Sequence, residues 1–364
     1  MRVLHCITKA DVGGAQTSLL ELVCGQLARG DQVEVATGIA GPVAEAIGRQ
    51  GARVHVIKRL RHPVRPFDDF QATRDLRVLI RTLKPDVVHG HSSKAGLLAR
   101  IASRLEGVPS VYTAHGWPFT PEASPTRRIA SWAGEAVGAI AGTRTICLNE
   151  TEAALARRAH LPKAARIDIV ANGLGDSDVR GDSSTGTIRL LMAARFAAPK
   201  AQLELLHGLA ATRGIPWTMT FAGDGPLRAA CERFVAESSL GDRVRFLGNV
   251  DDVAALLETT DVLVLWSGHE GQPMSVMEAM RAQVPVLSNE LPGVREMLGP
   301  GAMSIPRSPA SLHQALQTLA DHPALRRSLG CIGRQRYESN FGREQMVDGV
   351  ARAYAAAIAT AGKP

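Results

Sequence analysis

The sequence predicts an α/β protein built from two doubly wound domains that face an interdomain cleft. With 364 residues, the chain is long for a single hydrophobic core and suits two domains of about 150–180 residues each. Short β-branched runs alternate with longer amphipathic or Ala/Leu-rich stretches along the chain, which is typical of parallel α/β units. About six such runs fall in each half, and six strands are enough for a separate doubly wound, Rossmann-like sheet in each domain.

The expected elements follow from these runs in chain order. In the first half the predicted strands are Val3–Thr8, Val33–Thr37, Arg53–Ile57, Val87–His91, Ser110–His115 and Thr145–Leu148. In the second half they are Ile188–Met192, Trp217–Ala222, Val244–Leu247, Val262–Trp266, Pro285–Ser288 and Ala302–Ile305. Predicted helices between them include Ala15–Arg29, Lys94–Leu105, Ala201–Thr212, Leu227–Ser239 and Ser275–Arg281, and Gly342–Ala361 reads as a long terminal helix.

The break between the domains is expected at Asn172–Thr187. This stretch is rich in Gly, Ser and Asp and has no apolar period, as in a hinge or linker. We therefore expect a first domain over residues 1–172, a linker over 173–187 and a second domain over 188–340. Residues 341–364 are expected to form a helix that packs back on the first domain.

Composition excludes several classes of protein. Apolar residues make up 45% and charged residues 21% of the chain, as in soluble globular proteins. The sequence contains no run of 18 or more uncharged apolar residues, so we expect no transmembrane helix. The start of the sequence does not resemble a signal peptide. The five cysteines are scattered, with no Cys-x-x-Cys pair, which argues against a disulfide framework or a zinc site and favours a cytoplasmic location.

The positive charge is concentrated in one segment. Between Arg49 and Arg104 there are 13 Lys/Arg against four Asp, an excess of +9, so the rest of the chain carries −2 of the net +7. This distribution, with few aromatic residues to stack on bases, does not suit a nucleic-acid binder. Two interpretations stay open: solvated helix faces, or a surface that meets an anionic membrane or a phosphate-bearing acceptor.

Two cations mark a candidate anion site in the second half. In open parallel sheets, ligands bind beyond the carboxyl ends of the strands. Arg195 closes a predicted strand, and Lys200 follows at the entry to a helix. Two cations beside the free N–H groups of a helix N-terminus suit a diphosphate. Taken alone, the two residues fit surface charges on a loop equally well.

Two further strand ends carry weaker signals. Gly223 and Gly225 follow the strand Trp217–Ala222, and glycines there permit a tight turn and a close backbone approach to a ligand. Leu247 ends the next strand, where the backbone could contact a nucleobase edge. Each signal by itself fits any strand–helix junction.

A pair of glutamates follows the strand Val262–Trp266. Glu270 lies in the turn, Pro273 suits the first helical turn, and Glu278 lies further along the helix. The free amides near Ser275 point at an anion, as at other helix N-termini. Ordinary surface charge is the alternative, but the helix is otherwise apolar, so Glu278 is expected to be partly buried. Glu270 can then reach a sugar hydroxyl, and Glu278 can hold a ribose diol.

Taken in order, these motifs resemble the family 4 glycosyltransferases, which have the GT-B fold. The second half supplies Arg195 and Lys200, Gly223-Asp224-Gly225, Phe246-Leu247-Gly248, Glu270 with Glu278, and Pro292-Gly293-Val294-Arg295-Glu296. The first half supplies Gly13-Gly14-Ala15, Asp86 to Ser92, Tyr112-Thr113-Ala114-His115-Gly116 and Asn172-Gly173. The resemblance spans almost the whole chain, and the motifs become specific in combination.

The resemblance implies a role for each of these residues. Arg195 and Lys200 would neutralise the donor diphosphate in place of a metal, Glu278 would hold the ribose and Glu270 the donor sugar. His115 would lie beside the reacting sugar. The other donor-binding residues implied are Gly13, Gly14, Gly223, Leu247, Gly271, Gln272, Pro273, Met274 and Ser275. The first domain would bind the acceptor and the second the nucleotide sugar.

The implied activity is retaining transfer of a hexose from a nucleotide diphosphate, a UDP-sugar, to a saccharide or polyprenyl-linked acceptor in polysaccharide synthesis. No cofactor and no metal are expected; Asp176-Ser177-Asp178 mimics a metal-binding motif but lies in the linker, where we expect solvent-exposed turn residues. The basic segment suggests peripheral attachment to the inner face of the membrane. Two alternatives remain: a sugar-nucleotide 2-epimerase and a non-catalytic sugar-nucleotide-binding protein.

Overall fold

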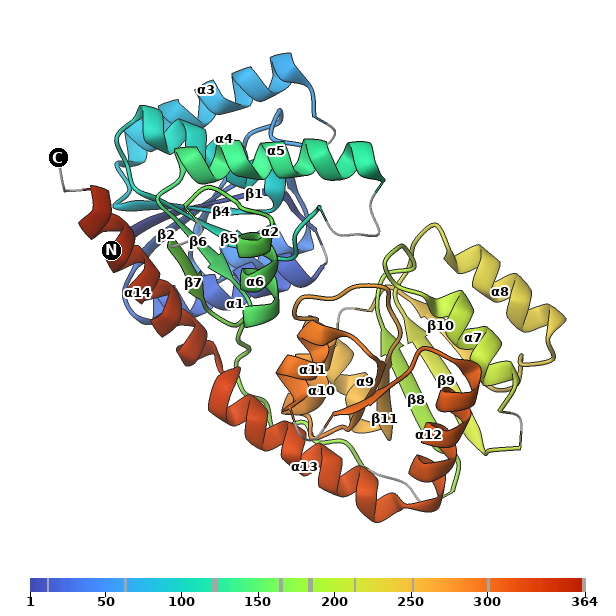
Figure 1. Ribbon diagram of the computed structural model, residues 1–364. Coiled ribbons are helices and arrows are strands. Elements are labelled where there is room, and N and C mark those ends of the chain that lie inside the picture. Colours follow the sequence, from blue (N-terminus) through green and yellow to red (C-terminus); the bar gives the residue numbers. More distant parts are fainter. Residues whose placement is uncertain are drawn as a thin grey trace. The chain divides into compact units, whose positions relative to one another are not determined.

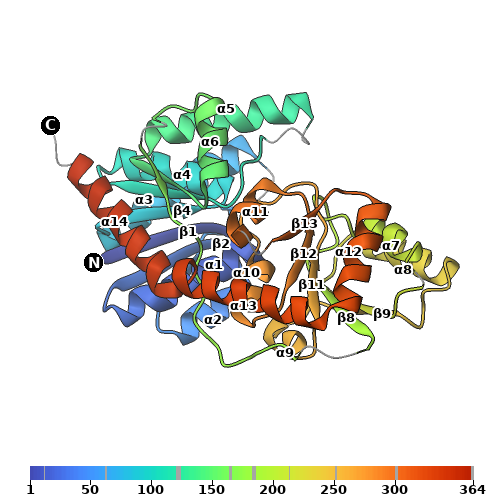
Figure 2. The ribbon, with the colours of Figure 1, turned by 60° about the horizontal axis from the view of Figure 1, so that its bottom comes forward.

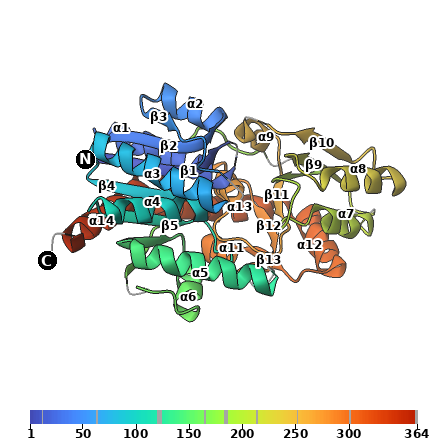
Figure 3. The ribbon, with the colours of Figure 1, turned by 90° about the horizontal axis from the view of Figure 1, so that it is seen from above.

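The structure is a computed structural model that describes residues 1–11, 13–61, 64–119, 124–163, 166–182, 186–212, 214–250, 252–299 and 302–361. The chain divides into two compact units. Unit 1 comprises Met1–Gly175 and Gly342–Pro364, and unit 2 comprises Asp176–Phe341. Figures 1–3 together label the elements of both units. Each unit is described by itself below.

Unit 1 contains a parallel sheet of seven strands in the order β3-β2-β1-β4-β5-β6-β7. The strands are β1 Arg2–Ala10, β2 Gln32–Ala40, β3 Arg53–Val56, β4 Val87–His91, β5 Ser110–Ala114, β6 Arg144–Cys147 and β7 Ile167–Ile169. The order reverses between β1 and β4, which are direct neighbours, as in a dinucleotide-binding fold.

Helices cover both faces of this sheet because alternate strand residues point to opposite faces. Leu4 and Cys6 of β1 pack with the helices α3 and α4, whereas Ile7 packs with α1 and α2 on the other face. The helices α3, α4 and α5 lie side by side (Figures 1 and 3). Their bounds are α1 Gly14–Ala28, α2 Pro42–Arg49, α3 Pro66–Leu83, α4 Ser93–Leu105, α5 Pro125–Ala141 and α6 Glu150–Arg158.

The last helix of the chain, α14 (Arg343–Ala361), completes unit 1. It packs against α1 and the strands β4, β5 and β6 (Figure 2). Its buried residues Met346, Val350 and Tyr354 join Val3 and Val87 in one apolar cluster. The two pieces of unit 1 are therefore held together by a shared core.

Unit 2 contains a parallel sheet of six strands in the order β10-β9-β8-β11-β12-β13. The strands are β8 Ile188–Ala193, β9 Trp217–Ala222, β10 Val244–Gly248, β11 Val262–Leu265, β12 Val286–Asn289 and β13 Met303–Ile305. Here the order reverses between β8 and β11. Both units thus have the doubly wound topology that the sequence predicts.

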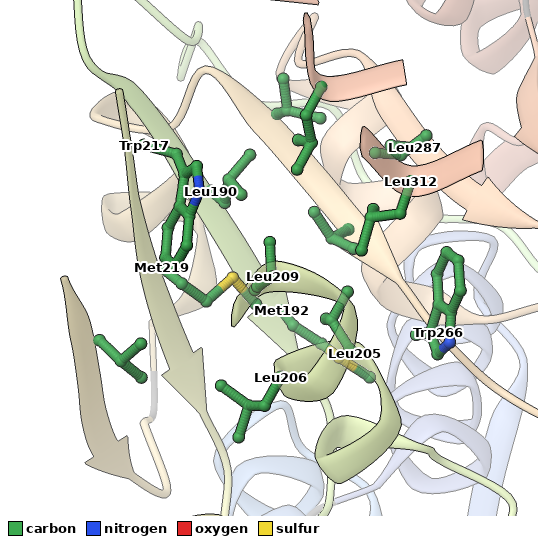
Figure 4. Close-up of a cluster of buried hydrophobic side chains, with 14 of the residues drawn as sticks. Leu190, Met192, Leu205, Leu206, Leu209, Trp217, Met219, Trp266, Leu287 and Leu312 are labelled. Carbon is green, nitrogen blue, oxygen red and sulfur yellow. The ribbon is translucent and has the colours of Figure 1, made fainter. Parts of the chain in front are cut away.

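The core of unit 2 lies between its sheet and the helices α7 and α12. Figure 4 shows Leu205, Leu206 and Leu209 of α7 against Trp217 and neighbouring strand residues. The helices of this unit are α7 Gln202–Ala210, α8 Arg228–Glu237, α9 Val253–Glu258, α10 Met274–Arg281, α11 Pro292–Leu298, α12 Pro309–Asp321 and α13 Pro323–Asn340. Within the described residues, no helix is both long and apolar enough to cross a bilayer.

The twelve predicted strands all occur; two have the expected bounds, and the ends of the others differ by at most three residues from those expected. The seventh strand of unit 1, Ile167–Ile169, was not predicted. Residues 183–185 of the expected linker lie outside the described residues. Asp176 and Asp178, at the start of that stretch, are exposed, and Asp176 binds Arg334 through both carboxylate oxygens at 2.6 and 2.7 Å.

Candidate functional site

In unit 2 the predicted residues gather at the carboxyl edge of the sheet, around the point where the strand order reverses. Arg195 and Lys200 follow β8, and Glu270 follows β11. Because β8 and β11 are neighbouring parallel strands, their carboxyl ends open on the same edge. Ligands of doubly wound sheets bind at such a switch point.

Backbone hydrogen bonds join the two loops. The Gly268 amide donates to the Pro199 carbonyl at 2.8 Å, and the Ala201 amide donates to the Trp266 carbonyl at 3.0 Å. The Ser267 hydroxyl also donates to the Pro199 carbonyl, at 3.1 Å. These bonds fix the loop that carries Lys200 against the loop that carries Glu270 before any ligand binds.

Lys200 and Glu270 form an ion pair across this junction. Their side chains are only 17% and 11% exposed, so the pair is partly shielded from water and the two charges are ordered. Arg195 is exposed, and no carboxylate in the described part of the chain pairs with its guanidinium. The junction therefore offers one cation that is already balanced and one that is available to an incoming anion.

Helix α10 begins directly after this loop, at Met274. The Met277 amide donates to the Pro273 carbonyl at 3.4 Å, and no side chain caps the N-terminus. The amides of the first turn, at Met274 and Ser275, thus have no acceptor within the helix. Glu278 lies half-buried on this helix, as expected from its apolar neighbours.

Gly223 and Leu247 lie on the same edge, after β9 and in β10. Gly223 has φ +138°, and a Cβ there would overlap the Ala194 carbonyl oxygen. Its amide donates to the Gly248 carbonyl at 2.6 Å. Leu247 is 45% exposed. Only glycine fits at position 223, which keeps the turn close to the loop of Arg195.

The remaining predicted residues lie in unit 1, on the carboxyl edge of its own sheet. Gly13 and Gly14 follow β1 and open helix α1, and His115 follows β5 directly. The strand β4 lies between β1 and β5 and ends at His91. The sequence-predicted residues thus form two groups, one on each unit.

A network of buried histidines beneath His115 was not foreseen. His5 Nδ1 lies 3.0 Å from His91 Nε2, and His91 Nδ1 lies 3.1 Å from His115 Nε2. His5 Nε2 lies 2.8 Å from the Gln26 amide oxygen. His89 lies beside this chain, and its ring centroid is 4.2 Å from the ring centroid of His91. The sequence motifs did not predict this cluster, because its members lie in or directly after three different strands.

A signal for this network exists in the sequence. His89 and His91 are two residues apart on β4, so they point to the same face. His5 of β1 is the register partner of His89, and it therefore points to that face as well. The face is the one covered by α1 and α14, which contribute Gln26 and Tyr354.

His5, His89 and His91 lie close enough together, within 4.8 Å, to be considered as metal ligands. Both ring nitrogens of each are already bonded to protein groups: those of His89 meet the Tyr354 hydroxyl at 2.7 Å and the Thr113 hydroxyl at 2.8 Å. Burial lowers the pKa of His5 to about 4 and that of His89 and His91 well below the ordinary value. The cluster thus works as a neutral hydrogen-bond network.

A small cavity adjoins this network. Its volume is about 10 Å³, and Ser18, His91, Thr113, His115 and Asn172 supply its polar lining. That volume suits one water molecule and excludes a sugar. A sugar that contacts His115 must therefore approach from the exposed side of the β5 loop.

The loop after His115 is anchored from below by helix α6. The buried Glu152 accepts the Trp117 amide at 3.3 Å, and the Trp117 indole donates to the Glu152 carbonyl at 2.9 Å. Gly116, between His115 and Trp117, has φ +114°. These contacts and the histidine chain hold His115 from two sides.

Comparison with protein families gives matches in both units. Residues 13–173 match the model described as "Glycosyl transferase 4-like domain". Residues 187–322 match the model described as "Glycosyl transferases group 1". The two matched ranges contain nearly all the residues discussed above, including His115, Lys200 and Glu270.

Curated relatives and solved structures are similar as well. A galactosyltransferase of Escherichia coli, named UDP-Gal:alpha-D-GlcNAc-diphosphoundecaprenol alpha-1,3-galactosyltransferase, is 27% identical over 70% of this chain and 70% of its own. The putative glycosyltransferase EpsD of Bacillus subtilis is 27% identical over 81% of this chain and 84% of its own. The structure of Anabaena Alr3699/HepE with UDP and glucose matches with a TM-score of 0.85 at 17% identity, covering 98% of this chain and 99% of that one.

Proposed function

Because the chain belongs to the glycosyltransferases, with a GT-B fold made of a transferase 4-like and a group 1 domain, we propose that its donor is a UDP-sugar and that transfer retains the anomeric configuration. The acceptor is a saccharide or a polyprenyl-linked saccharide in polysaccharide synthesis. The observation that carries this proposal is the junction of Lys200, Glu270 and the start of α10 at the switch point of unit 2.

The donor diphosphate binds at this junction. Arg195 and Lys200 supply two positive charges, and the first-turn amides of α10 add donors aimed at an anion. Lys200 exchanges its Glu270 partner for a phosphate oxygen when the donor arrives, which leaves Glu270 free to accept from a sugar hydroxyl. The ion pair thus keeps both side chains ordered before the donor binds.

The ribose and the sugar are held by the two glutamates. Glu278 lies one to two turns into α10, half-buried among Val276, Met277 and Met280, and a carboxylate there can accept from both hydroxyls of a ribose diol. Glu270 lies nearer the phosphates and holds the sugar. Gly223 and Leu247 contribute backbone contacts on the nucleotide side.

Transfer proceeds by electrostatic stabilisation of the leaving diphosphate. Arg195, Lys200 and the amides of α10 offset the charge that develops on the departing oxygen, the role that a metal has in other transferases. The acceptor hydroxyl attacks on the face that the diphosphate leaves and passes its proton to a phosphate oxygen. His115 of unit 1 binds the reacting sugar.

Nucleotide binding tests the donor site directly. UDP at 100 times its dissociation constant should stabilise unit 2 by about 2.7 kcal/mol, with EDTA present as well as without it. Stabilisation that requires magnesium or manganese would overturn the metal-free proposal. The anomeric configuration of the product made from an α-linked UDP-sugar, measured by NMR, tests retention.

The same incubation separates the alternatives. A 2-epimerase would change the donor sugar without an acceptor, and a non-catalytic binding protein would leave the labelled donor unchanged in the presence of a lipid extract. Label that appears in a saccharide or lipid-linked product supports transfer.

The basic loop before α3 suits an anionic membrane surface. Lys58, Arg59, Arg61 and Arg65 are all exposed, and exposed apolar side chains lie next to them: Val64 at 72%, Phe67 at 70% and Phe70 at 66%. Pro63, between Arg61 and Val64, lies outside the described residues. Each well-placed cation contributes about 1 kcal/mol at an anionic leaflet, and Arg65 contributes less because Asp68 lies 3.8 Å away.

Liposome flotation tests this attachment. The protein should float with vesicles that contain phosphatidylglycerol at low salt and should dissociate as salt rises, because the surface potential is screened. A variant with all four cations changed to Gln should not float. Equal flotation of the two proteins would show that this loop does not attach the protein to the membrane.

A further inference from the structure

His115 stands at the outer end of a hydrogen-bonded chain of imidazoles that the mechanism above does not use. The chain runs from Gln26 on α1 through His5 on β1 and His91 on β4 to His115 after β5, with separations of 2.8, 3.0 and 3.1 Å. Each link between two imidazoles joins one nitrogen of a ring to one nitrogen of the next. The inner members are fully buried or nearly so.

Neutral imidazoles in such a chain cannot choose their tautomers independently. A neutral ring has one N–H and one lone pair, so a ring that donates through one nitrogen must accept through the other. Burial favours the neutral form here: it lowers the pKa of His5 and His115 to about 4 and that of His91 well below its ordinary value. Fixing the proton at one end therefore fixes it along the whole chain.

The amide of Gln26 decides the direction. Its oxygen faces His5 at 2.8 Å, and its nitrogen donates to the Tyr354 hydroxyl at 3.2 Å. An amide oxygen only accepts, so His5 carries its proton on Nε2 and presents a lone pair on Nδ1. His91 then donates from Nε2 to His5, and His115 donates from Nε2 to His91.

The hydrogen bonds on the other side of Gln26 fit the same direction. The Tyr354 hydroxyl accepts from Gln26 and so has its own proton for His89 Nδ1, at 2.7 Å. His89 Nε2 then donates to the Thr113 hydroxyl at 2.8 Å. Every donor in the network has an acceptor, and the Gln26 amide is held from both sides.

We propose that this relay fixes His115 as the Nε2–H tautomer, so that its Nδ1 lone pair accepts a hydrogen bond from a hydroxyl group of the sugar substrate. No bond to His115 Nδ1 is formed by the described residues, and the side chain is partly exposed. Gln26, His5 and His91 act as positioning residues that do not touch substrate. The assignment to a sugar hydroxyl rests on the proposed transferase function, whereas the tautomer does not.

The tautomers can be read directly by NMR. In the full-length protein labelled with ¹⁵N-histidine, long-range ¹H–¹⁵N correlations at pH 7.5 should show His5, His91 and His115 all as Nε2–H. Observation of His115 as Nδ1–H, or as an even mixture, overturns the proposal. This readout needs no substrate, so it stands apart from the success or failure of the transferase assay.

Substitution of His91 tests the coupling. In His91→Gln the amide oxygen can accept from His115 while the amide nitrogen donates to His5, so the tautomer of His115 should be kept. His91→Leu offers neither group, so the Nε2–H tautomer of His115 should no longer predominate over the Nδ1–H tautomer. The value of kcat should then fall about tenfold, as expected for one lost hydrogen bond. An unchanged tautomer in His91→Leu overturns the proposal.

A matched control and a binding measurement complete the test. His55→Gln removes a histidine that binds Glu34 on neighbouring strands and lies outside the relay; it should change neither the tautomer of His115 nor kcat. UDP-sugar and acceptor are added to the wild type in separate titrations. Only one of them should shift the Nδ1 resonance of His115, and that one carries the hydroxyl group that donates to it. No movement with either overturns the substrate contact.

Discussion

Acidification should destabilise unit 1 strongly between pH 7.5 and pH 5. His5, His89 and His91 are almost fully buried, and desolvation lowers the pKa of each, to about 4 for His5. The unfolded chain binds these protons at its ordinary pKa of about 6.5, whereas the folded chain does not. Stability that is fully present above pH 6.5 is therefore lost as the pH falls towards 4.

The size of the effect follows from the unfolded state. At pH 5, protonation of one histidine of pKa 6.5 stabilises the unfolded chain by about 2 kcal/mol. His5, whose folded pKa is about 4, therefore removes about 2 kcal/mol, and the lowered pKa values of His89 and His91 act in the same direction. A loss of this size is a sizeable part of the stability of a typical domain, about 5–15 kcal/mol.

Hydrogen exchange followed by mass spectrometry can resolve the two units. Peptides from β1 and β4 should lose protection as the pH falls from 7.5 to 5, after correction for the intrinsic exchange rate, and peptides from β8 and β9 serve as a reference within the same molecule. The variant His89→Gln keeps a donor and an acceptor but cannot titrate, so it should lose less stability than the wild type over the same pH range. A change below about 1 kcal/mol in wild-type unit 1 would falsify the neutral, buried network.

The donor site gives further predictions. Lys200→Ala should lower kcat by about 10²- to 10³-fold, as for other groups that stabilise a developing anion, while circular dichroism shows an unchanged fold. Glu278→Gln should weaken UDP binding in calorimetry, whereas Glu270→Gln should mainly lower turnover; equal losses of UDP affinity would contradict these separate roles. Gly223→Ala should destabilise unit 2 by about 1–3 kcal/mol in urea titrations because of its φ of +138° and the carbonyl oxygen against it. Gly241→Ala, where an added Cβ meets nothing within 4 Å, is the matched control and should be close to neutral.

The fold could be predicted because the buried strands of a doubly wound sheet are short, apolar and bounded by turn residues. Val87–His91 and Trp217–Ala222 have the predicted bounds. Ile167–Ile169 was missed because three residues at a sheet edge carry too little pattern to distinguish them from a loop. The observed strands extend beyond the predicted ends where polar residues continue the hydrogen-bonded pairing of the strands, as at Arg2 and Gln32.

The contacts within the site could not be predicted in the same way. Lys200 and Glu270 are 70 residues apart, and their ion pair depends on β8 and β11 being neighbours, which spacing along the chain does not reveal. The histidine relay likewise requires the register of β1 against β4. Sequence motifs identified the residues at the strand ends, whereas the pairings among them follow from strand order.

The position of α14 has a consequence for how the protein is made. Unit 2 occupies one continuous stretch of chain, whereas unit 1 needs its first 175 residues and the last helix. During synthesis the strands β4, β5 and β6 emerge early but wait for Met346, Val350 and Tyr354, which are translated after the whole of unit 2. Domains usually complete from the N-terminus onwards; here the N-terminal unit finishes second. A nascent chain that stops before residue 342 leaves an apolar strip and the hydrogen-bonding ends of Gln26 and His89 uncovered, so such truncated products should be clients of chaperones and proteases.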